Sequence, residues 1–328
     1  MVLLSWMIYN QVKAYDSTQL GSHFELSTRA SWRNFLLVPV LMLMPLNWLL
    51  EAQKWRLLLS PFTKITFDQA LKTIFVGITL GVVTPARVGE YAGRLISSDQ
   101  HYRSQVITAT MLGSIAQNTI NIAVGLLLCY GFLNSIDLLN SWQYSTFTIV
   151  VSLQVALLLW IYYHLPKVVS SFKNMIKRII KYEIKIDFSY LSIYSHSILN
   201  ITIGISFLRY LTYFLQYFLI LLFLGVGNDW IDLASSISTI FLIQTGIPVP
   251  AFLSIFARGE LAILVWGQLS IPAFIALTAS LILWFTNLIF PALIGLYFLY
   301  KEKNIHLLYK PKAKNQNLNN IITNKNND

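Results

Sequence analysis

Residues 106–133 read VITATMLGSIAQNTINIAVGLLLCYGFL and contain no charged side chain. A helix needs about 20 apolar residues to cross the hydrocarbon core of a bilayer, so this stretch is long enough to span one. A second uncharged run extends from Leu261 to Tyr300. Lipid-exposed backbone must satisfy its own hydrogen bonds, so we interpret both runs as helices. They predict a helical integral membrane protein.

The composition supports this class and excludes others. Of the 328 residues, 55% are hydrophobic and only 12% are charged, about half the soluble norm. The net charge of +10 could suggest nucleic acid, but the basic residues gather between the apolar runs, where the positive-inside rule explains them. We therefore expect no nucleic-acid partner. The single cysteine, Cys129, excludes a disulfide framework or a cysteine metal site within one chain.

The distribution of lysine and arginine predicts the topology. Apolar runs occur at about 1–9, 34–50, 68–83, 105–133, 142–163, 195–226, 233–247, 251–267 and 271–299. Segments 51–67 and 84–104 carry three basic residues each, 164–194 and 300–328 carry six each, and 134–141 and 227–232 carry none. The four basic segments are predicted to be cytoplasmic, which places the C-terminus inside the plasma membrane.

This topology leaves two short runs that enter the bilayer and return. Run 68–83 has basic segments on both sides and is predicted to form a re-entrant hairpin from the cytoplasm. Region 233–267, broken at Pro248 and Pro250, is predicted to form a second one from outside, before a crossing at 271–299. The prediction is an all-α polytopic protein over 1–300, with about six spans and two hairpins. Its halves, 1–133 and 142–299, form an inverted repeat, which is typical of secondary transporters.

Four segments carry further expectations. Residues 1–9 lack the basic region of a signal peptide and are interpreted as a truncated first span. Run 195–226 is too long for one straight span, so a tilted or interfacial piece is expected before a span near 210–226. Segment 166–187 is either an amphipathic helix on anionic headgroups or a solvated loop. The basic tail 301–328 is expected to be disordered.

The strongest local motif is TPARVGEYAGR at 84–94. Pro85 is expected to end one half-helix and start another. Arg87, Glu90 and Arg94 would then lie on one helical face, at spacings of three and four. A net positive cluster beside a helix N-terminus predicts a site for an anionic headgroup or phosphate.

The second hairpin repeats part of this pattern, because Arg258 and Glu260 follow the breaks at Pro248 and Pro250. Ionisable groups inside a membrane usually face protein or water and mark a pathway. The alternative is that each arginine only neutralises its neighbouring glutamate and fixes the hairpin.

Other polar residues in the apolar runs allow two interpretations. Arg209 either extends to the cytoplasmic surface or belongs to the pathway. The amides of Gln117, Asn118 and Asn121 either line a polar cavity or bond neighbouring helices.

No enzymatic constellation is found. The five histidines are scattered, and neither a Gly-rich nucleotide loop nor a nucleophile elbow occurs. We therefore predict no catalytic residues, no metal and no cofactor.

The pair Trp55-Arg56, followed by residues 84–90, resembles the signature of the lysylphosphatidylglycerol synthase transmembrane region, a flippase-like membrane domain, over about 34–300. Where that family often has a proline and then a glycine-rich stretch ending in an acidic residue, this chain has Pro248 to Glu260 with bulky Phe252 and Phe256, and glycine only at Gly259.

In bifunctional members of this family a cytoplasmic domain transfers an amino acid to phosphatidylglycerol, and the membrane domain translocates the product. Only 28 residues follow Tyr300 here. The resemblance therefore implies a flippase-like relative without the synthetic activity, in a bacterial or archaeal plasma membrane.

Three functions follow as hypotheses. The leading one is movement of a lipid or polyprenyl-linked anionic substrate, bound by Arg87, Glu90, Arg94, Arg258 and Glu260. The second is a non-catalytic membrane partner of a separate cell-envelope enzyme, contacting it through 166–187. The third is a membrane-embedded transferase, for which Glu90 and Glu260 are the candidate carboxylates.

Overall fold

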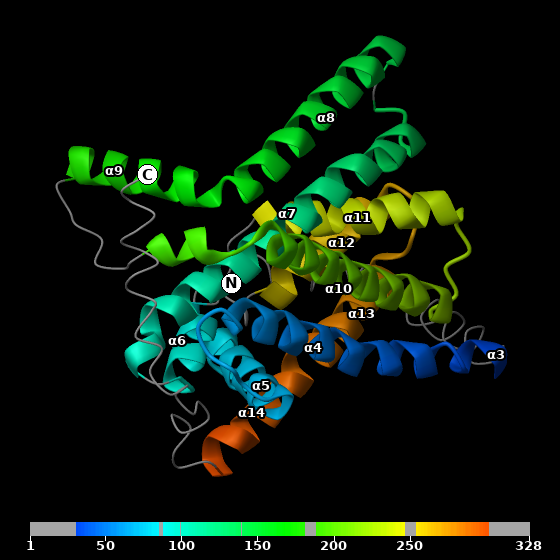
Figure 1. Ribbon diagram of the computed structural model, residues 1–328. Helices are drawn as coiled ribbons and strands as arrows, with labels where there is room; N and C mark the ends of the chain where they lie inside the picture. The colour runs from blue at the N-terminus through cyan, green and yellow to red at the C-terminus, as the bar shows by residue number, and fades with distance from the viewer. Residues whose placement is uncertain are drawn as a thin grey trace.

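The computed structural model describes residues 31–84, 88–98, 100–138, 140–180, 188–246 and 254–301. These residues are almost entirely helical, and no strand occurs among them, so the all-α prediction is confirmed (Figure 1). The predictions made for Pro85, Arg87, Pro248 and Pro250, and for segments 1–9 and 302–328, fall outside the described residues.

The helices follow one another with short connections. In chain order they are α3 (Ser31–Asn34), α4 (Leu37–Leu59), α5 (Phe67–Val83), α6 (Val88–Ile96), η2 (Gln100–Tyr102), α7 (Arg103–Ser135), α8 (Ser141–Tyr163), α9 (Leu165–Ile180), η3 (Ser189–Ile193), α10 (His196–Phe223), α11 (Trp230–Gly246), α12 (Ser254–Gly267), α13 (Ala273–Trp284), the π-helical turn η4 (Phe285–Ile289) and α14 (Phe290–Lys301).

Five of the described helices are long and apolar enough to cross a membrane: Trp32–Leu59, Arg103–Ser135, Trp142–Tyr163, His196–Phe223 and Ala273–Lys301. They confirm a polytopic membrane protein. The sixth predicted span, at 1–9, is not among the described residues.

Helices α5 and α6 form a close hairpin where the first re-entrant segment is predicted. Thr66 and Gln69 begin α5 with a reciprocal capping box. Glycines allow the two helices to touch: a Cβ atom on Gly93 would lie 2.6 Å from the Cα of Gly77. The prediction that run 68–83 itself enters and returns is therefore wrong, because this run is the single helix α5 and the returning helix is α6, in the segment predicted to be a basic loop. Entry of the hairpin from the cytoplasm stays a prediction.

Three element predictions need correction. The span predicted to end near residue 50 continues as α4 to Leu59, so the first part of segment 51–67 is helix, not loop. Run 195–226 forms one continuous helix, α10, in place of the two predicted pieces. Segment 166–187 begins with the helix α9, so the loop alternative is wrong up to Ile180.

Apart from α8, the span predicted to begin the second half, whose counterpart at 1–9 lies outside the described residues, the two halves have the same order of elements: a span, a hairpin and a span. The first half contains α4, α5–α6 and α7, and the second contains α10, α11–α12 and α13–α14. Their contacts are reciprocal, because α4 packs on α10, α5 packs on α14, and α11 packs on α7. The inverted orientation of the repeats stays a prediction.

Glycines make both hairpin contacts close. A Cβ atom on Gly295 of α14 would lie 2.1 Å from the carbonyl oxygen of Phe75 in α5, and one on Gly125 of α7 would lie 2.7 Å from the Cβ of Leu242 in α11. Each hairpin is thus seated on the last span of the other half.

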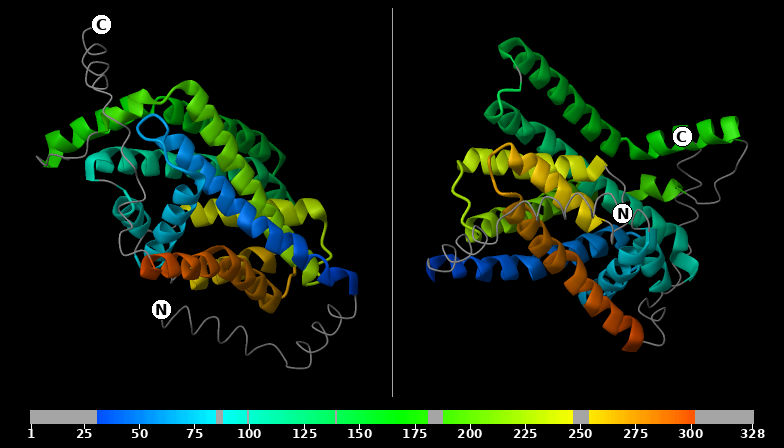
Figure 2. Two further views of the ribbon diagram at one scale, coloured as in Figure 1. Left: turned by 60° about the horizontal axis from the view of Figure 1, so that its bottom comes forward. Right: turned by 180° about the vertical axis from the view of Figure 1, so that it is seen from behind.

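Helices α8 and α9, which the predicted boundaries place in the second half, stand away from the bundle in Figures 1 and 2, and because they join α7 to α10 we call them the connector. Only 6% of the most apolar window of α8 is buried. Its C-terminal end is anchored, since the Tyr162 hydroxyl donates to the Leu199 carbonyl at 3.1 Å and that of Tyr163 donates to Asn200 Oδ1 at 2.7 Å.

Candidate functional site

The site begins with one polar face of α4. Asn47, Glu51 and Lys54 follow one another at intervals of four and three, which places them on the same side of the helix. All three are buried, and Lys54 is only 1% exposed. Their face is covered because α10 packs along α4 and α7 also contacts it.

Glu51 is the anionic centre of a buried ion cluster. Its Oε2 atom accepts from Lys54 Nζ at 2.8 Å and from Arg209 Nη1, and its Oε1 atom accepts from Arg94 Nη2 at 2.9 Å. The carboxylate side chain is 11% exposed, and the three cationic side chains range from 2% to 14%. Burying ions costs several kcal/mol each unless they are paired. One carboxylate therefore holds three cations from three different elements.

Arg209, at the middle of α10, joins this cluster to α7. Its Nε donates to Asn47 Oδ1 at 3.0 Å, and its Nη1 also donates to Gln117 Oε1 at 3.1 Å. The Gln117 amide donates onward to Asn121 Oδ1 at 3.3 Å, and Asn121 donates to Thr245 Oγ1 of α11 at 3.3 Å. A continuous polar network thus connects α4, α10, α7 and α11.

Arg94 is positioned by the hairpin on which it lies. Its guanidinium carbon is 4.6 Å from the ring centroid of Trp55, so a cation–π contact accompanies its ion pair with Glu51. Helix α6 can bring it there because the glycines of α5 and α6 let the two helices approach.

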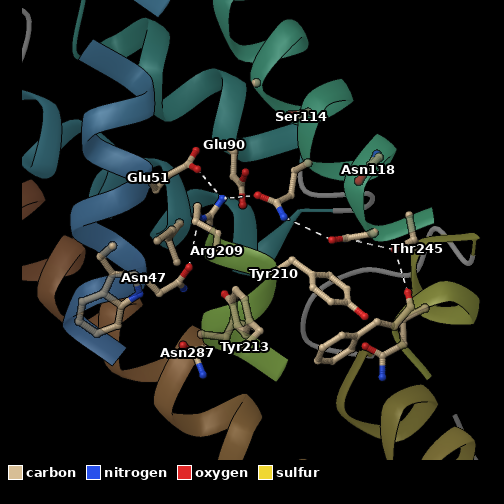
Figure 3. Close-up of a pocket in the computed structure, with 18 of the residues that line it drawn as sticks. Asn47, Glu51, Glu90, Ser114, Asn118, Arg209, Tyr210, Tyr213, Thr245 and Asn287 are labelled. Atoms are coloured by element: carbon tan, nitrogen blue, oxygen red, sulfur yellow. Dashed lines mark hydrogen bonds and ion pairs between the residues drawn. The ribbon is translucent and has the colours of Figure 1, made fainter. Parts of the chain in front are cut away.

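These groups line a cavity of about 540 Å³. Its charged lining residues are four cations and two carboxylates: Lys54, Arg94, Arg209, Arg258, Glu51 and Glu90, a net charge of +2. In Figure 3 Glu90, Ser114 and Asn118 lie on one side of the cavity, and Tyr210 and Tyr213 lie on the opposite side. The volume is that of a small-molecule site.

The chemistry of this cavity favours binding of an anion. Guanidinium groups present planar forks of donors that match phosphate and carboxylate oxygens. In the part of the chain that the structure describes, no group of three or more histidines, cysteines or carboxylates could hold a metal ion.

The structure places the predicted site residues as follows. Glu90 and Arg94 of α6 and Arg258 of α12 line the cavity. Glu260 is 6% exposed but does not belong to the lining. Arg87 lies outside the described residues.

Two groups for which alternatives were left open are also in the lining. Arg209 bonds Glu51 inside the protein, so its extension to the cytoplasmic surface is wrong. Gln117, Asn118 and Asn121 line the cavity, and Gln117 and Asn121 also bond neighbouring helices, so the two interpretations of these amides hold together.

Sequence reasoning missed Asn47, Glu51 and Lys54. The apolar run stops near residue 50, and Lys54 was counted as a loop residue that sets the topology. The spacing of four and three on a helix that is otherwise apolar was the available signal, because it puts the polar side chains on one face.

Comparisons with known proteins identify the chain at the level of family. The family model described as "Lysylphosphatidylglycerol synthase TM region" matches residues 2–295. Comparisons with curated proteins and with solved structures returned no match.

Proposed function

Because the chain belongs to the lysylphosphatidylglycerol synthase transmembrane region family, we propose that it moves an anionic lipid or lipid-linked substrate across the plasma membrane. The cavity around Glu51 is the site for the headgroup in this proposal. The C-terminus lies in the cytoplasm, as the basic segments predict.

One observation carries the proposal: the lining holds four cations against two carboxylates within a membrane domain. Like charges repel strongly where the dielectric constant is low. A headgroup with one or two negative charges reduces that imbalance, whereas a cationic headgroup increases it. The cavity therefore supports binding of anionic headgroups.

The arrangement of the halves supports a route across the membrane. The cavity is lined by both first spans, α4 and α10, and by helices of both hairpins. In transporters with two repeats, one repeat rocks against the other around a central site. Here, such a motion would expose the headgroup to one side and then to the other, while α4 and α10 keep the cluster away from lipid.

The test is lipid movement in liposomes that contain the purified protein. We expect fluorescent phosphatidylglycerol to cross faster than in protein-free liposomes, and phosphatidylcholine, which is zwitterionic, to cross much more slowly. Replacing a cation that contacts Glu51, as in Arg209→Gln or Arg94→Gln, should reduce the phosphatidylglycerol rate about tenfold or more, since a charge-assisted bond is lost.

Lys72→Gln is the matched control. Lys72 pairs with Asp68 on α5, 3.0 Å away, outside the cavity lining. This variant should keep the wild-type rate. The proposal is rejected if wild-type protein moves no anionic lipid, or if Arg209→Gln and Lys72→Gln behave alike at equal amounts of folded protein.

A further inference from the structure

The cavity is built from equivalent positions of the two halves. Asn47 of α4 and Arg209 of α10 are 162 positions apart and bond each other where the two first spans cross. The next positions keep this separation, since Trp48 corresponds to Tyr210 and Glu51 to Tyr213. All six residues line the cavity.

The hairpin contacts repeat with a nearly identical separation. Gly295 faces Phe75 and Thr79 of α5, and Gly125 faces Ser238 and Leu242 of α11. Both pairs of hairpin residues differ by 163 positions (75 and 238, 79 and 242), and the two glycines differ by 170 (125 and 295). The contact between the first-half hairpin and the last span of the second half thus has a counterpart between the second-half hairpin and the last span of the first half.

The last spans complete the correspondence. Four consecutive lining positions of α7 match four of α13 and η4 at a separation of 170. They are Gly113 and Leu283, Ser114 and Trp284, Gln117 and Asn287, and Asn118 and Leu288. The Gly-Glu pairs at 89–90 and 259–260 have this separation too. The matched separations and the reciprocal contacts thus relate the two halves to each other, and their first spans meet at the Asn47–Arg209 bond.

The two sets of equivalent residues differ in chemistry. Where the first half places Glu51, Ser114 and Asn118, the second places Tyr213, Trp284 and Leu288. At these three matched positions the first-half side of the cavity is polar or charged, and the second-half side is aromatic or aliphatic.

Other lining positions depart from this division: Arg209, Gln244, Thr245, Arg258 and Asn287 of the second half are polar or charged, and Trp48, Ile74 and Ile78 of the first half are apolar. Arg209 belongs to the second half but bonds Glu51 of the first. Asn287 donates its amide to Gln216 Oε1 at 3.0 Å. Trp48 belongs to the first half, but its ring stacks on Phe290 of α14 with centroids 6.0 Å apart. The apolar wall is therefore limited to Tyr213, Trp284 and Leu288, and the polar wall consists of Glu51, Ser114 and Asn118 with the cations that Glu51 binds.

From these matched positions we infer that the cavity binds one amphiphile, with its anionic headgroup at the cations gathered around Glu51 and its hydrocarbon portion along the apolar wall of Tyr213, Trp284 and Leu288. The inference rests on the proposed function for the anionic lipid, and it adds where the headgroup and the hydrocarbon portion of that lipid lie, so that a soluble phosphate would fill only part of the site. A soluble anion would leave the aromatic wall without apolar contacts, whereas a chain buries it.

The test is direct binding to purified protein in a nonionic detergent, without any transport step. Dioleoyl phosphatidic acid, glycerol 3-phosphate and dioleoylglycerol are compared by their effect on thermal unfolding. Phosphatidic acid should raise the unfolding temperature at much lower concentration than glycerol 3-phosphate, since only the former contacts both walls. Equal potency of these two probes would overturn the inference, as would equal potency of dioleoylglycerol and phosphatidic acid.

Variants then test the contribution of each wall to binding separately. Leu288→Asn copies the first-half residue Asn118 into the apolar wall and should weaken phosphatidic acid binding roughly tenfold while leaving glycerol 3-phosphate unaffected. Arg94→Gln should weaken both. The control Leu293→Asn changes an exposed leucine of α14 outside the lining and should change neither.

Trp284→Gln serves as a second variant of the apolar wall if Leu288→Asn does not fold. Wild-type affinity for phosphatidic acid in a folded apolar-wall variant would overturn the inference. Binding with the expected pattern but without lipid movement in liposomes would refute the proposed function and leave the inference standing.

Discussion

At the scale of single residues, Glu51 determines the electrostatics of the cavity. It contacts Lys54, Arg94 and Arg209 at once, and these side chains come from α4, α6 and α10. Removing one partner of a buried ion pair is far more costly than removing an exposed one, because the remaining charges stay desolvated. The carboxylate thus has a structural duty in addition to any contact with substrate.

We expect Glu51→Gln to lower the free energy of unfolding by about 3–5 kcal/mol, because three buried cations lose their common carboxylate. Thermal unfolding in detergent would measure this loss. Asp68→Asn is the control, since Asp68 pairs with Lys72 at an exposed position, and its effect should stay within about 1 kcal/mol. Equal destabilisation by the two variants would contradict the role assigned to Glu51. Adding Lys54→Met to Glu51→Gln should restore part of the stability.

The ion cluster could be predicted from the sequence only in part. A basic residue beyond an apolar run looks the same whether the chain leaves the membrane or the helix continues, so Lys54 was assigned to a loop. Arg209 could be identified as an ionisable group within an apolar run, but its partner Glu51 lies 158 positions away and no local pattern reveals it. Arg94 and Glu90 could be selected because their motif is compact.

At the scale of elements, the α5–α6 hairpin depends on glycine. A Cβ atom on Gly93 would meet the Cα of Gly77 at 2.6 Å and its amide nitrogen at 2.8 Å, and backbone cannot move aside as a side-chain end can. Since α6 carries Arg94, the separation of these two helices also sets the position of a cation in the cavity.

Gly93→Ala should therefore destabilise the protein by about 1–3 kcal/mol through overpacking. Gly204→Ala is the control, since a Cβ atom there meets nothing within 4 Å and alanine favours a helix over glycine. Unfolding temperatures measured in the same detergent should fall for the first variant and stay level or rise for the second. A fall of the same size in both would show that the hairpin contact is unimportant.

The predicted helices match the structure best where an apolar run has no charged residue and is long enough to cross a membrane. The uncharged run at 105–133 coincides with most of α7. The bounds of run 68–83 also coincide with those of α5, but this run is one helix and not the predicted hairpin. Predictions failed where a helix carries charges into the interior: α4 was ended too early at Glu51, and α10 was divided near Arg209. These charges are stabilised inside the protein because they pair with each other across helices. The composition along the chain gives no information about such pairing.

At the scale of the whole molecule, the halves are held together by reciprocal contacts. Each hairpin rests on the last span of the other half, and the first spans cross at the Asn47–Arg209 bond. The order of elements could be predicted from the topology of basic segments. The residue-by-residue correspondence could not, because the two halves share little identity and the equivalence becomes visible only through common contacts.

The exposed connector has a consequence for how the protein is assembled. Helices α8 and α9 join the halves, only 6% of the most apolar window of α8 is buried, and the contacts between the halves are made by other helices. Fragments 1–180 and 181–328, produced together with different tags, should purify as one complex. Fragments 1–120 and 121–328 should not, since that cut interrupts α7. Failure of the first pair to associate would refute this.

If the first pair does associate, the peptide link between the halves is a tether and not a structural support. The same architecture could then be encoded by two separate genes, and a membrane carrying two such half-proteins could assemble a complete cavity from a heterodimer.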